Sequence, residues 1–71
     1  MSTSAVQEVE QQIIDCLAES GKWMNQREIR KATGMPMSRV ENFTLSLALE
    51  DRIDRTLTPD HRTQLFRAKA L

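Results

Sequence analysis

The sequence predicts a mainly α-helical fold with a small β component, in which three helices precede a two-stranded β-hairpin. Three observations support this prediction. Apolar residues recur every three or four positions near the start, two helix-start signals can be recognised, and residues 53–68 contain two extended stretches around a turn sequence. With 71 residues the chain is expected to form a single domain, residues 1–71, whose core is thin.

The first helix is expected over about residues 5–20. Ser4 and Gln7 have the spacing of a capping box, and Gly21 supplies the left-handed residue that ends many helices. The apolar stripe of this helix consists of Val6, Val9, Ile13, Cys16 and Leu17. Because Cys16 lies on the stripe, we expect it to be a small buried hydrophobic residue.

The second helix is expected over about residues 26–33. Asn25 and Glu28 form another capping box, and Gly34 follows as the stop. The residues expected to face inward are Ile29 and Ala32. Before this helix, a short extended connector is expected to place Trp23 in the core.

The third helix is expected over about residues 37–50, with Pro36 at its start, where the missing N–H costs nothing. Its inward stripe consists of Val40, Phe43, Thr44 and Leu47. The hairpin is expected to begin at residue 53 and to end at residue 68. Its turn, Thr58-Pro59-Asp60-His61, carries proline at the second position, as β-turns favour.

The run Asn25 to Val40, with the segment Leu47 to Arg55 after it, resembles the helix-turn-helix and the leucine–turn–isoleucine–arginine hinge of MarR-like regulators. This resemblance covers about residues 5–70 and implies a winged helix-turn-helix fold, with the hairpin as the wing. Asp51 stands where those regulators usually have glycine, and aspartate tolerates the left-handed conformation.

The segment from Gly34 to Ala48 is also similar to the framework of Z-DNA-binding winged helices. Those domains read the zigzag backbone with a lysine, an asparagine and a tyrosine, and the matching positions here are Met37, Glu41 and Leu45. None of these three side chains can replace its counterpart. The resemblance therefore implies the shared framework without the recognition of left-handed DNA.

The winged-helix resemblance implies that the third helix enters the major groove of duplex DNA. Arg39 is expected to bond guanine and Asn42 adenine, whereas the second helix and the wing tip would meet phosphates or the minor groove. The full set of expected DNA-binding residues is Arg27, Arg30, Lys31, Ser38, Arg39, Asn42, His61 and Arg62. An ordinary solvated helix face explains the bases of the second helix equally well.

A second interpretation is a protein interface on the third helix. Leu45 and Leu49 lie one turn apart and off the inward stripe, and Glu41 beside them would repel phosphate. The residues of this expected interface are Met37, Glu41, Leu45 and Leu49. Its partner would be another protein or a second copy of the chain. Alternatively, the helix buries a wider face than its stripe indicates, or the domain is a small subunit of a nucleic-acid-associated complex.

Composition narrows the classes of function. Ten bases balance ten acids, so the chain is no simple polycation, and its bases cluster in residues 22–39 and in the tail. One cysteine and one histidine cannot form an intrachain disulfide or a Cys/His zinc site, and no nucleophile set or phosphate-binding glycine loop is present. Composition thus leaves a non-enzymatic, cytoplasmic protein that needs no cofactor, small-molecule substrate or membrane as the expectation. The winged-helix resemblance adds the expectation of a transcriptional regulator that binds duplex DNA.

Overall fold

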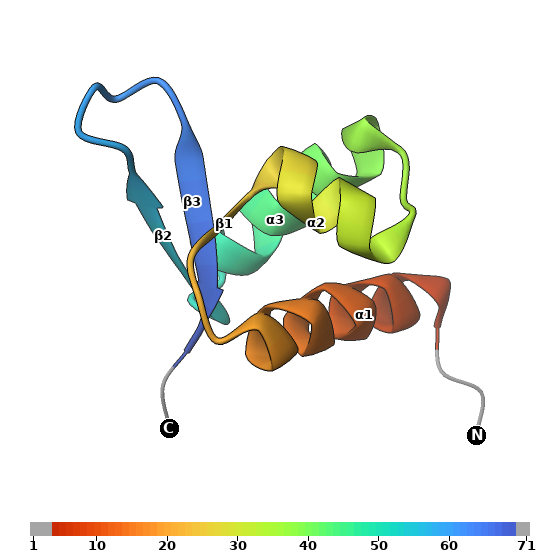
Figure 1. The fold of residues 1–71 in the computed structure, drawn as a ribbon. Coiled ribbons are helices and arrows are strands. Elements are labelled where there is room, and N and C mark those ends of the chain that lie inside the picture. The colour runs from red at the N-terminus through yellow and green to blue at the C-terminus, as the bar shows by residue number, and fades with distance from the viewer. Residues whose placement is uncertain (1–3, 70–71) are drawn as a thin grey trace.

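The computed structural model describes residues 4–69. Its elements, in chain order, are α1 (Ala5–Ser20), β1 (Met24–Asn25), α2 (Gln26–Thr33), α3 (Met37–Leu49), β2 (Ile53–Leu57) and β3 (Gln64–Ala68). Figure 1 shows α1 running beneath α2 and α3, with the sheet at one end and the β2–β3 hairpin projecting beyond the helices. The fold is the three-helix winged helix-turn-helix that the sequence predicts, and each helix begins and ends within one residue of its expected bounds.

Two reciprocal capping boxes begin α1 and α2. The Ser4 hydroxyl accepts from the Gln7 N–H at 3.1 Å, and the Gln7 side chain accepts from the Ser4 N–H at 3.3 Å. At α2, the Asn25 side chain accepts from the Glu28 N–H at 2.7 Å, and the Glu28 carboxylate accepts from the Asn25 N–H at 3.0 Å. These bonds satisfy N–H groups that an uncapped helix would leave without partners.

Left-handed residues end all three helices. Gly21 and Gly34 have φ values of 64° and 76°, and Asp51, which follows the C-cap Glu50 of α3, has a φ of 62°. The Asp51 N–H donates to the Ala48 carbonyl at 3.0 Å, and the Arg52 N–H donates to the Leu47 carbonyl at 2.9 Å. This pair of bonds is a Schellman motif. Aspartate therefore takes the place that glycine usually occupies in this turn.

The sheet has three strands rather than the two expected. Its order is β1-β3-β2 and both pairings are antiparallel, with Phe66 of β3 opposite Met24 on one side and Arg55 on the other. The two-residue strand β1 corrects the expectation of a plain connector. Two residues show no periodicity, and their partners lie at the far end of the chain, so no local signal marks this strand.

The core lies between the helices and the inner face of the sheet. Its buried apolar residues are Ile13, Leu17, Ile29, Met35, Val40, Leu47, Ile53 and Phe66. The expected stripes are only partly buried. Cys16 is half-buried, Val6 is 55% exposed, and Ala32, which we expected to face inward, is exposed. The first turn of α1 and the last turn of α2 therefore extend past the core that would cover them.

Trp23 is not the core anchor that the sequence suggested. Its ring is half-buried, and the guanidinium carbon of Arg67 lies 4.4 Å from the ring centroid. A cation at this distance is attracted to the face of an indole ring. The tryptophan therefore packs against Arg67 of β3 instead of lying in the core.

Thr44 is the buried polar residue of the core, and it joins α2 to α3. Its hydroxyl donates to the Val40 carbonyl at 2.6 Å and accepts from the Gln26 side-chain amide at 3.1 Å. Both roles of the hydroxyl are therefore used within the protein. Within residues 4–69, none of the helices is long and apolar enough to cross a membrane.

Replacing Asp51 with glycine is expected to raise the free energy of unfolding by about 0.5–1 kcal/mol, because glycine adopts a positive φ without a Cβ clash. Urea denaturation measures the change. Asp51→Asn is the control, since it removes the exposed carboxylate that lies 2.8 Å from the Lys69 amine but keeps a residue that tolerates this φ. A glycine variant no more stable than the asparagine variant would contradict the prediction.

Thr44→Val is expected to lower the free energy of unfolding by about 1–2 kcal/mol, because the part-buried Gln26 amide loses its acceptor. Thr56→Val makes the same chemical change at an exposed strand position, and we expect it to be neutral within about 0.5 kcal/mol. Equal stability of the two variants in urea would show that the Gln26–Thr44 bond does not stabilise the junction.

Candidate nucleic-acid interface

The exposed side of α2 carries three cations. Arg27, Arg30 and Lys31 are all exposed, and together they line a shallow hollow where α2 turns into α3. The rest of this hollow is formed by Gly34, Met35 and Pro36. The helix-turn-helix thus places its basic side chains around the turn itself, and we call this site the turn hollow.

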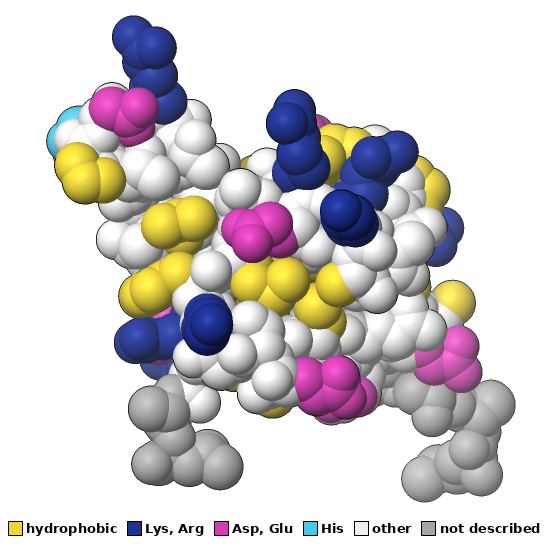
Figure 2. All heavy atoms as spheres, viewed as in Figure 1, with side chains coloured by type: hydrophobic (Ala, Val, Ile, Leu, Met, Phe, Trp, Pro, Cys, Tyr) yellow, Lys and Arg dark blue, Asp and Glu magenta, His cyan; other side chains and the backbone are white. Residues whose placement is uncertain are grey.

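The wing tip faces the beginning of α2 and α3. A second hollow, which we call the wing-side hollow, lies between the three elements and is lined by Asn25, Gln26, Arg27, Met37, Glu41, Arg62, Thr63 and Gln64. Arg27 lines both hollows, so the two are neighbours on one surface. In Figure 2 several dark-blue basic side chains stand along the upper side, at the wing tip and over the helices, and others lie lower on the left and in the middle.

In the part of the chain that the structure describes, the cations of this surface form no intramolecular ion pair. Within residues 4–69 there are two ion pairs, Arg52 with Glu10 at 3.2 Å and Lys69 with Asp51 at 2.8 Å. Neither involves the residues that we group as the basic surface, which are Arg27, Arg30, Lys31, Arg39 and Arg62. Their charges are therefore available to an anionic partner.

A hydrogen-bonded turn shapes the wing tip. The Asp60 carboxylate accepts from the Thr58 hydroxyl and from the Arg62 N–H at 3.1 Å, and the His61 N–H donates to the Thr58 carbonyl at 2.8 Å. The bonds from Thr58 and from Arg62 hold the pKa of Asp60 below its ordinary value. His61 has a φ of 60° and an exposed side chain. The turn thus presents His61 and Arg62 outward.

The first half of α3 offers polar side chains. Ser38, Arg39 and Asn42 are exposed, as expected for groups that meet a groove. Ser38 and Asn42 are four residues apart and therefore lie one above the other on the helix. Arg39 directly follows Ser38 and is therefore turned about 100° around the helix from it. Each of the expected base-reading residues is thus accessible from outside the protein.

The second half of α3 is apolar at its surface. Leu45 is 38% exposed and Leu49 is 89% exposed, and both line a hollow between α3 and β2 that also contains Ala48, Asp51, Ile53, Asp54 and Arg55. Met37, in contrast, is half-buried and packs against the core. The residues expected for a protein interface line two hollows. Met37 and Glu41 line the wing-side hollow, and Leu45 and Leu49 line the hollow beside β2, although all four are spaced by four residues and therefore follow one side of α3.

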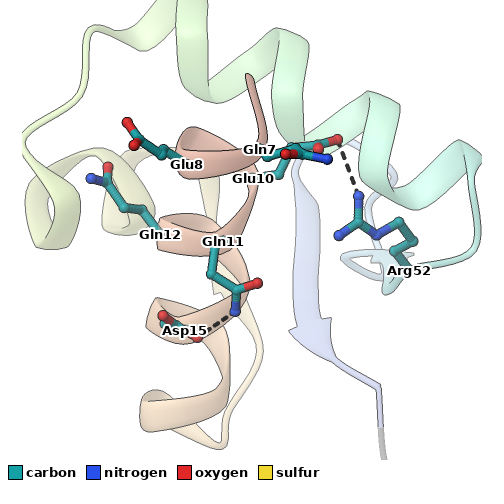
Figure 3. A pocket seen from close by; sticks show the side chains of 7 residues that line it. All are labelled: Gln7, Glu8, Glu10, Gln11, Gln12, Asp15 and Arg52. Atoms are coloured by element: carbon teal, nitrogen blue, oxygen red, sulfur yellow. Dashed lines mark hydrogen bonds and ion pairs between the residues drawn. The ribbon is translucent and has the colours of Figure 1, made fainter. Parts of the chain in front are cut away.

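The acids of α1 lie on a separate face. Figure 3 shows a polar hollow along this helix, lined by Gln7, Glu8, Glu10, Gln11, Gln12, Asp15 and Arg52. Its only cation, Arg52, points toward Glu10 and is paired with it, and Gln11 donates to Asp15 at 2.8 Å. The hollow therefore presents amides and carboxylates. The carboxylates disfavour an anionic ligand there, because like charges repel.

The sequence reasoning did not identify the amide and hydroxyl groups of the wing-side hollow. Gln26, Thr63 and Gln64 line it beside Arg62, and their positions at the start of α2 and after the wing turn are the signals that could have indicated them. The described residues hold no cluster of three potential metal ligands.

The thiol of Cys16 lies apart from these hollows, on α1. Burial, with a smaller contribution from Glu19, raises the pKa of the Cys16 thiol.

Comparison with protein-family models, with curated proteins and with solved structures gives no match to this chain.

Proposed function

We propose that this protein binds duplex DNA, in the manner of a winged-helix transcriptional regulator, with the first half of α3, the exposed side of α2 and the wing tip. The observation that carries the proposal is the convergence of Arg27 and Arg62 on one hollow beside the start of α3. These two arginines come from α2 and from the wing, and a shared surface suits a continuous polyanion better than a small anion.

The roles of the side chains follow from their chemistry. Cations of α2 and the wing tip would neutralise phosphates, which provides affinity and register without reading sequence. The first turns of α3 would enter the major groove, where Arg39 suits guanine and Asn42 suits adenine. The carboxylates of α1 would face away from the DNA and steer the approaching duplex toward the basic surface.

A second candidate function is protein binding through the second half of α3. It is favoured by the leucine pair, since Leu49 is 89% exposed in a domain whose core is small. The partner would be another protein or a second copy of the chain. Because the leucine pair lines a different hollow from Arg27 and Arg62, the two functions can coexist, as they would in a subunit of a nucleic-acid-associated complex.

Lys31→Ala is expected to weaken binding to every duplex alike, and to reduce the slope of log K against log salt by about one unit, because one phosphate contact is lost. Fluorescence anisotropy with a mixed-sequence duplex at several salt concentrations measures both changes. Lys69→Ala is the matched control, since it removes the same charge from the chain outside the basic surface. An identical effect of the two substitutions would mean that DNA affinity depends on the net charge of the chain and not on the position of Lys31.

Leu49→Asp is expected to leave the free energy of unfolding within about 0.5 kcal/mol of the parent value, because an exposed leucine supports little of the core. If the leucine pair mediates self-association, sedimentation equilibrium will show a dimer for the parent chain and a monomer for this variant. Leu57→Asp is the control, because Leu57 is also exposed but lies outside the hollow between α3 and β2. This variant should keep the oligomeric state of the parent. A parent chain that stays monomeric at millimolar concentration excludes the homodimer.

A further inference from the structure

A carboxylate lies in the middle of the proposed DNA-binding surface. Glu41 is exposed and lines the wing-side hollow, where the other charged residues are Arg27 and Arg62. Within residues 4–69, the Glu41 carboxylate takes part in neither ion pair and in none of the side-chain hydrogen bonds. Only the backbone carbonyl of Glu41 is bonded to a side chain, since it accepts from the Thr44 hydroxyl at 3.3 Å. A surface that served phosphate binding alone would lose affinity by carrying this group, because like charges repel.

The position of Glu41 on α3 suits contact with base edges. Ser38 precedes it by three residues and Asn42 follows it directly, and in an α-helix residues three and four apart are neighbours on one face. Ser38, Glu41 and Asn42 are all exposed. Glu41 therefore belongs to the same outward patch as the asparagine expected to read adenine.

The backbone of Glu41 is held in place. Thr44 donates to the carbonyl of Val40 and accepts from Gln26, so this turn of α3 is tied to the first residue of α2. The backbone at Glu41 therefore keeps a fixed position relative to Gln26 and the adjacent Arg27, while the exposed carboxylate itself can reach a ligand.

An ionised carboxylate only accepts hydrogen bonds, and this limits the bases that it can contact favourably. In the major groove, cytosine presents the N4 amine as a donor, whereas thymine and guanine present carbonyl oxygens that would repel the carboxylate. Adenine presents both the N6 amine as a donor and N7 as an acceptor. The amide of Asn42 can bond to both of these groups, whereas a carboxylate can bond only to the amine. Cytosine is therefore the base that Glu41 suits.

We propose that Glu41 determines base specificity, by accepting a hydrogen bond from the N4 amine of a cytosine in the major groove. This inference rests on the proposed binding of duplex DNA. The inference adds that DNA binding is sequence-selective. The Glu41 carboxylate favours a duplex with cytosine at the contacted position and weakens binding to a duplex that lacks it. Arg39, on the neighbouring part of the helix, is then free to read a guanine.

The test begins with selection of bound duplexes from a random pool by the full chain. The affinities of the selected duplex, and of a version with T·A in place of C·G at the enriched cytosine, are then measured for the parent chain and for Glu41→Gln. We expect the parent to prefer cytosine about tenfold, since a mismatched base pair costs binding energy of this order. The glutamine variant should bind both duplexes within about twofold, because an amide can also donate to thymine O4.

Glu50→Gln is the matched control, because it removes the same charge at the other end of α3, and it should keep the tenfold preference. If Glu41→Gln keeps the preference for cytosine and binds every duplex more tightly by the same factor, the inference is overturned. Glu41 would then act only by repelling phosphates. A parent chain that binds all duplexes equally would also overturn it, while duplex binding itself stands. If the parent binds no duplex even at low salt, the proposed function fails as well.

Discussion

Burial of Phe66 at the centre of the sheet is the constraint on which the wing depends. This side chain is inaccessible to solvent, and its strand β3 pairs with β1 on one edge and with β2 on the other. Burying a phenylalanine contributes about 1.5–3 kcal/mol, a large share of what so small a domain can gain. Because the hairpin continues from this anchored strand, the position of the wing tip relative to the helices follows from the core.

The chain is neutral overall, but its acidic and basic side chains gather on different parts of the surface, so one side is basic. The exposed bases of α2 and the wing tip are free of ion pairs within the described residues, whereas acids line α1. Net charge alone would have argued against a nucleic-acid partner. The local distribution decides the electrostatic attraction at contact distance, since salt screens charges that lie more than about 10 Å apart.

One side of α3 borders two hollows because its two halves meet different neighbours. Its first half lies beside α2 and the wing tip and bears polar groups, including Glu41 in the wing-side hollow. Its second half lies beside β2 and bears Leu45 and Leu49. The leucine pair, which seemed to compete with DNA for one helix face, therefore leaves the first turns of the helix open to a groove.

The sequence by itself determined the limits of the helices and the exposure of most candidate residues. The capping boxes at Ser4 and Asn25 and the left-handed turn at Asp51 depend on contacts within a few residues, so local patterns predict them. The tertiary structure alone decided the third strand, the outer position of Trp23 and the meeting of Arg27 with Arg62. These features join residues far apart in the chain, and a local pattern does not say which distant residues will meet.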